Sequence, residues 1–138
     1  MTSLALPHKS IDALARADNP KKAIQDAIGN LDGVEIIGDM VLIGIYIRPE
    51  KTKGGIIRPQ SNVTEDVYQG KVGLVLKWGP DAFFDPNSGD LFEQRVNPGE
   101  WCVFKVGDAW NVTIKDVPCR LVRDSAIKMK LQDPDSVF

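Results

Sequence analysis

The chain has 138 residues, of which 43% are hydrophobic and 26% are charged, and its net charge at pH 7 is −2. These values are typical of a single globular domain and exclude a globally disordered chain. The small net charge argues against a dominant role in binding nucleic acid, which usually requires a basic excess. No apolar run approaches the roughly 20 residues that span a bilayer, so we expect a cytoplasmic protein with no membrane partner.

The first quarter of the chain, residues 1–34, is predicted to form a short helical extension. Asn19 is a good N-cap and Pro20 suits the first helical position. Gly29 weakens the helix, and Gly33 is expected to end it. The apolar face of this helix comprises Ala23, Ile24, Ala27, Ile28 and Leu31. This face either packs on its own domain or belongs to an arm that docks on a neighbouring subunit.

From residue 36 onward the pattern changes to short strands separated by Gly, Pro and Asp turns. The first segment, "IIGDMVLIGIYI", is apolar at alternate positions on both faces, so both of its faces should be covered. Further strand segments are "GKVGLVLKWGP" (70–80), "EWCVFKV" (100–106), "AWNVTIK" (109–115), "VPCRLVRD" (117–124) and "AIKMKL" (126–131). This series predicts a mainly β fold, a small antiparallel barrel over residues 35–131 with a tail at 132–138.

Two connections are unusually long for a compact domain. Residues 49–69 contain "EKTKGGIIRPQSN", and loops of this length are usually functional or disordered. Residues 80–100 contain the turn signal "DPNSGD" between two apolar pairs, which predicts a β-hairpin projecting from the barrel. The apolar pairs of this hairpin are Phe83-Phe84 and Leu91-Phe92.

The residues needed for catalysis are missing from the predicted fold. His8 is the one histidine, and it stands alone, so neither a metal site nor a histidine base is expected. Cys102 and Cys119 lie far apart without metal or redox spacing, and we expect both to be buried free thiols. "KTKGGII" lacks the order of a phosphate-binding loop. The sequence therefore predicts a protein that is not an enzyme and carries no cofactor or metal.

The order of these segments resembles the GroES-type co-chaperonin (chaperonin-10) family over residues 35–131. The similar segments are "GDMVLI", "KTKGGII", "GKVGLVLKWGP", "VNPGEWCVF" and "DSAIKMKL", and the hairpin at 80–100 stands where the family has its roof hairpin. The resemblance implies a non-catalytic homo-oligomer, a heptameric lid that caps a chaperonin ring and assists protein folding. ATP would be bound by the ring. The mobile loop of the family corresponds here to Gly54, Gly55, Ile56, Ile57 and Arg58.

The chain departs from the family pattern in ways that leave alternatives open. The family loop carries three consecutive apolar residues, whereas the third position here is Arg58. Gly54 and Gly55 could instead make a turn, with both isoleucines packed locally. The 34-residue leader has no counterpart in ordinary co-chaperonins, and the distance of the sequence suggests a divergent, bacteriophage-encoded member. The alternative function is a virion head decoration protein on the same barrel, with the major capsid protein as its partner.

Overall fold

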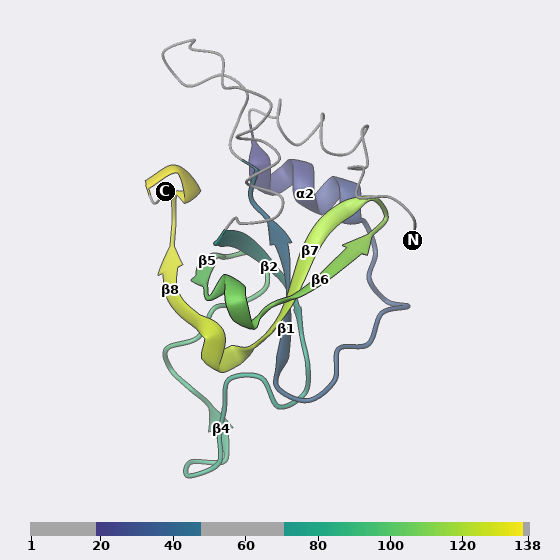
Figure 1. Ribbon diagram of the computed structural model, residues 1–138. Helices are drawn as coiled ribbons and strands as arrows, with labels where there is room; N and C mark the ends of the chain where they lie inside the picture. The colour runs from purple at the N-terminus through teal and green to yellow at the C-terminus, as the bar shows by residue number, and fades with distance from the viewer. Residues whose placement is uncertain (1–18, 48–70, 137–138) are drawn as a thin grey trace.

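The computed structural model describes residues 19–47 and 71–136, and their arrangement is shown in Figure 1. The helix is α2 (Pro20–Ile28), and the strands are β1 (Met40–Ile45), β2 (Val72–Trp78), β3 (Phe84–Asp85), β4 (Asp90–Leu91), β5 (Trp101–Phe104), β6 (Trp110–Ile114), β7 (Val117–Arg123) and β8 (Ile127–Leu131). Three single-turn 3₁₀ helices are η1 (Val106–Asp108), η2 (Asp124–Ala126) and η3 (Pro134–Ser136). The predicted mainly β fold with one short N-terminal helix is confirmed.

Six of the strands form one antiparallel sheet in the order β6-β7-β1-β2-β5-β8. In the described residues its two edges are β6 and β8. The register of β1 against β2 shifts between Leu42 and Ile43, and that of β5 against β8 shifts between Val103 and Phe104. Such irregularities bend strands and increase their twist, as a barrel requires. The remaining pair, β3 and β4, forms a separate small hairpin at one end of the sheet, at the bottom of Figure 1.

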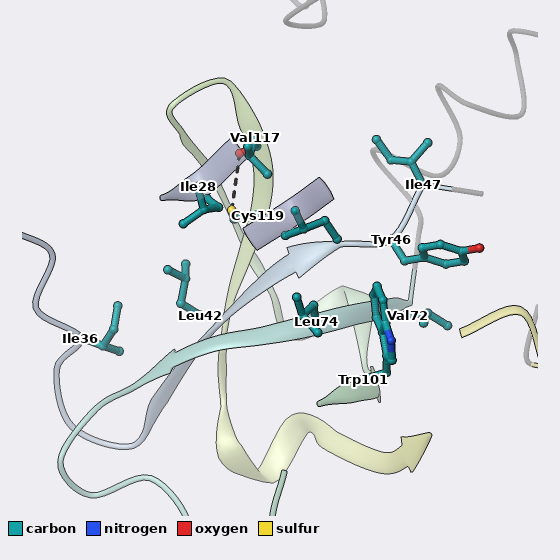
Figure 2. Close-up of a cluster of buried hydrophobic side chains, with 11 residues drawn as sticks. Ile28, Ile36, Leu42, Tyr46, Ile47, Val72, Leu74, Trp101, Val117 and Cys119 are labelled. Carbon is teal, nitrogen blue, oxygen red and sulfur yellow. Dashed lines mark hydrogen bonds between the residues drawn. The ribbon is translucent and has the colours of Figure 1, made fainter. Parts of the chain in front are cut away.

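Both faces of the central strand β1 are buried, as its apolar alternation predicts. Successive strand residues point to opposite faces, so Leu42 joins one cluster while Val41 and Ile43 join the other. The helix-side cluster, drawn in Figure 2, comprises Ile24, Ile28, Ile36, Leu42, Tyr46, Ile47, Val72, Leu74, Trp101, Val117 and Cys119. The hairpin-side cluster comprises Val41, Ile43, Ile45, Val75, Ala82, Phe83, Val96, Cys102, Phe104, Val122 and Ala126.

Helix α2 begins as expected but ends earlier than expected. The Asn19 side chain accepts a hydrogen bond from the Lys22 N–H at 3.1 Å, which is the predicted N-cap. The helix ends at Ile28 and not near Gly33, because Gly29 adopts φ +64° and its N–H bonds to the carbonyl of Gln25. Glycine takes this left-handed conformation without steric cost, so the first glycine encountered terminates the helix.

The buried face of α2 is part of the same core as the strands. Ile24 and Ile28 are almost fully buried in the helix-side cluster. The connection back to the sheet is held by Lys77, whose Nζ donates to the carbonyls of Leu31 at 3.0 Å and Val34 at 2.6 Å. The helix therefore covers one face of its own sheet.

Candidate functional site

The loop expected at residues 49–69, with Gly54, Gly55, Ile56, Ile57 and Arg58, lies outside the described residues. Both of its attachment points are described. β1 leads into Tyr46 and Ile47, and the chain returns at Lys71 to enter β2. Tyr46 N–H donates to the Val72 carbonyl at 3.0 Å, and Phe104 N–H donates to the Lys71 carbonyl at 3.0 Å. The loop is thus attached to the central strands of the sheet.

Aromatic packing reinforces this attachment. Tyr46 is fully buried, and its ring meets Trp101 edge to face with centroids 5.3 Å apart and an interplanar angle of 68°. Figure 2 shows the two rings side by side next to Val72, with the Tyr46 hydroxyl pointing out of the cluster. That hydroxyl donates a hydrogen bond to Oδ1 of Asp135 in η3. Sequence reasoning missed this set, because Tyr46 and Asp135 are 89 residues apart and no local pattern links them.

The hairpin at the other end of the sheet carries three exposed apolar side chains. Phe84 pairs with Leu91 across the strands, and the turn closes where Gly89, at φ +74°, donates its N–H to the Asp85 carbonyl at 2.9 Å. Phe84, Leu91 and Phe92 are 41%, 37% and 44% exposed. They form what we call the hairpin patch.

Phe83 differs from its neighbours in the hairpin. It is 7% exposed, belongs to the hairpin-side cluster, and has its ring centroid 5.1 Å from that of Trp78. Its backbone has φ +56°, which is unusual for a residue other than glycine. Asp124 Oδ2 accepts the Phe83 N–H at 2.8 Å and holds this conformation. Phe83 therefore fixes the hairpin to the sheet, while the hairpin patch faces outward.

The two cysteine thiols in the described residues are placed where they react poorly. Cys102 and Cys119 are free and buried, as predicted, and burial raises the pKa of each thiol to about 12. A thiol that stays protonated is a poor nucleophile. No three His, Cys, Asp or Glu side chains within residues 19–47 and 71–136 gather so that they could hold a metal ion. No helix in this part of the chain has the length and apolarity that a bilayer crossing requires.

Comparison with known protein families shows which family this fold belongs to. Residues 33–131 match the Cpn10 family, described as the chaperonin 10 kDa subunit, over more than two-thirds of the chain. The chain belongs to the Cpn10 family. No curated protein matches it in a sequence search. As a Cpn10 protein it is a non-catalytic co-chaperonin that assists protein folding, and the family implies a chaperonin ring as partner and a heptameric assembly.

The Cpn10 match can be followed on the fold. It begins at Gly33, after helix α2, and ends at Leu131, the last residue of β8. It therefore includes every strand of the sheet, the β3–β4 hairpin and the segment between β1 and β2. Helix α2 and the C-terminal turn η3 lie outside the matched residues, although both contact residues of the helix-side cluster. These two elements are where this Cpn10 protein has structure that the family match does not account for.

Proposed function

We propose that this Cpn10 chain caps its chaperonin ring through residues 49–69, with Ile56 and Ile57 as the side chains that enter the ring. The observation that supports the proposal is the attachment of both ends of this segment to β1 and β2, central strands of a sheet that lies entirely within the residues matched to the family. The barrel of residues 35–131 serves as the lid, and residues 1–34 serve as an extension that adds to it. Seven such subunits would present seven loops.

The energetics suit a lid that binds and leaves repeatedly. Burial of an isoleucine in an apolar groove contributes roughly 1.5–3 kcal/mol. Ordering of the loop backbone opposes this by about 1–2 kcal/mol per residue, partly offset by new hydrogen bonds. A single loop therefore binds weakly. Seven linked loops raise the overall affinity by about 10²–10⁴, because later contacts become intramolecular.

Arg58 shapes how far the loop enters the groove. The guanidinium is costly to desolvate, whereas its aliphatic stem packs well against an apolar rim. We therefore place Gly54 and Gly55 at the bend, both isoleucines in the groove, and Arg58 at its edge.

ATP is bound and hydrolysed by the ring. The complex works in the cytoplasm, which is that of the host if the gene is carried by a bacteriophage.

The test is co-elution of the purified protein with a chaperonin ring in the presence of ATP or ADP. We expect nucleotide-dependent binding by the wild-type protein and loss of binding by Ile57→Asp, because a carboxylate is expensive to bury in an apolar groove. Asn62→Asp adds the same charge to the same segment and is the matched control, which should still bind. Retained binding by Ile57→Asp would contradict the assignment of the loop.

The alternative of a virion decoration protein is tested by two further measurements. Native mass spectrometry of the free protein should show a heptamer if it is a lid. Quantification of this chain in purified particles should show no fixed, high copy number. A monomer or trimer that is abundant in virions would favour the decoration role and a capsid location.

A further inference from the structure

The C-terminal turn η3 is an ordered element outside the Cpn10 match. Asp133 organises it: its Oδ1 accepts the Asp135 N–H at 2.9 Å, and its carbonyl accepts the Ser136 hydroxyl at 2.7 Å. Pro134 is buried, so the turn is seated against the protein and not merely a solvated tail. β8 delivers this turn to its place, since Leu131, at the end of β8, pairs with Trp101 in β5.

The turn contacts Tyr46, which lies shortly before the 49–69 segment. The Asp135 carboxylate accepts the hydroxyl hydrogen bond of Tyr46, whose ring packs on Trp101. The backbone N–H of the same Tyr46 donates to the Val72 carbonyl, the last hydrogen bond described between the two arms of the loop. The Tyr46 hydroxyl thus contacts the turn, and its ring contacts the core. The Tyr46 backbone bonds to Val72 and so joins the two ends of the loop.

We propose that η3 is a positioning element for the chaperonin-binding loop, and that Asp135 is the positioning residue. By holding Tyr46 through a charge-assisted hydrogen bond, the turn keeps the Tyr46–Val72 closure intact and fixes the ends of the loop. A fixed base lowers the conformational entropy that the loop loses when it binds the ring. Loss of the contact therefore weakens ring binding although Asp135 touches no part of the ring. This consequence for binding rests on the proposed function of the loop.

The first test reads the closure directly, by hydrogen exchange of backbone amides in the full-length protein. Tyr46→Phe and Asp135→Ala each remove one partner of the contact. A hydrogen bond to a charged group contributes on the order of 1.5–3 kcal/mol, so we expect protection of the amide at residue 46 to fall about tenfold or more. The Gly79 amide, which bonds to the Met40 carbonyl at the far end of β1, should keep its protection. The matched carboxylate control is Asp108→Ala, which removes an exposed pair with Lys105.

The second test measures affinity for the chaperonin ring. Both single variants should raise the dissociation constant several-fold, and the double variant should add little to either one, as residues acting through one contact are non-additive. Unchanged protection at residue 46, or an equal loss at Gly79, would overturn the proposal. If the wild-type protein binds no ring, the proposed function fails while the exchange result still decides whether η3 holds the base of the loop. If the wild type and both variants bind equally, the positioning role is wrong and the lid function stands.

Discussion

Gly44 is the residue that lets helix α2 lie close to β1. A Cβ built at this position would be 2.8 Å from Cγ2 of Ile24 and 3.3 Å from Cδ1 of Leu76. Ile24 belongs to the helix-side cluster and Leu76 packs against it, so both side chains are closely packed and have little room to shift. Helix α2 can therefore pack this closely on β1 only because residue 44 has no side chain. The helix itself lies outside the residues matched to the family.

Gly44→Ala should accordingly destabilise the protein by about 1–3 kcal/mol, the usual cost of adding a carbon to a packed core. Gly107→Ala is the control, because a Cβ there would meet nothing within 4 Å; it should be neutral or stabilise by up to about 1 kcal/mol. Urea unfolding followed by circular dichroism measures both. Equal stability of the two variants would show that α2 does not pack on β1 as described.

Glu100 contributes a pH-dependent part of the stability. The backbone N–H of Asn97 donates to its Oε1 at 2.7 Å, and this bond, followed by the charge of Lys130 with Nζ 3.7 Å from Oε2, lowers the pKa of Glu100 below its ordinary value of 4.5. A carboxyl whose pKa is lower in the folded state stabilises the protein above its unfolded pKa. That stabilisation is lost as the pH falls through the folded value.

Glu100→Gln should therefore flatten the decline of melting temperature between about pH 5 and pH 3, since one acid-sensitive contact has been removed. Melting curves across this range, with Glu93→Gln as the control for loss of an exposed glutamate, measure the effect. A decline as steep as that of the wild type would mean that Glu100 makes no net contribution through its ionised form.

At the scale of elements, the β3–β4 hairpin depends on a residue from a distant strand junction. Asp124 follows β7, and it accepts the N–H of Phe83 where that residue holds a positive φ. A second bond fixes the return of the hairpin, as the Trp78 indole donates to the Val96 carbonyl at 3.0 Å. A strained residue persists only where its surroundings hold it in place, and here they aim the hairpin patch outward.

Asp124→Ala should loosen the hairpin more than the six-stranded sheet. Removal of the acceptor leaves a largely buried N–H unpaired, which costs about 1–3 kcal/mol. Hydrogen exchange should become faster at Phe83 and at Phe92, whose N–H bonds to the Phe83 carbonyl at 2.7 Å. The exchange rates of the backbone amides around Gly44 in β1 should change less. Uniform acceleration across the sheet would instead assign Asp124 to general stability.

For the whole molecule, the two thiols report on cooperativity. Cys102 lies in the hairpin-side cluster and Cys119 in the helix-side cluster, so one thiol is buried on each face of the sheet. Burial raises both pKa values from 9.0 to about 12. The folded protein therefore holds these protons at pH values where the unfolded chain releases them. The contribution of the two thiols to stability is complete below about pH 9 and is lost as the pH rises toward 12.

Because a single sheet joins the two clusters, both thiols should become reactive together. We expect negligible labelling of the native protein by a thiol reagent at neutral pH, and equal labelling of both positions through the urea transition. Mass spectrometry of the labelled peptides measures the two fractions. Labelling of Cys119 well before Cys102 would show that α2 and the helix-side cluster open separately.

Much of the architecture could be predicted from local patterns. Alternation of apolar residues locates the strands, because each strand must place successive side chains on opposite faces. The N-cap at Asn19 was predicted for a similar reason: its side chain acts on an amide three residues away. The predicted helix end at Gly33 was wrong because two glycines could end the helix, and the packing of Ile28 favours the first.

The candidate site was predicted less completely. The hairpin was expected from its turn signal, but nothing local separates Phe83, which packs inward, from the outward Phe84. That difference follows from the positive φ of Phe83, which depends on Asp124, 41 residues away. The Gly-Gly-Ile-Ile sequence of the loop remains a prediction, because it lies outside the described residues.

By itself, the sequence determined the order of the strand segments and the resemblance to the family, since these depend on the periodicity of apolar residues and on the order of the motifs along the chain. Tertiary structure alone decided that α2 covers its own sheet, that Asp124 aims the hairpin, and that Asp135 reaches Tyr46. Each of these is a contact between segments far apart in the chain. The twist and bend of the sheet bring these segments together, and no local pattern of residues encodes which distant segments will meet.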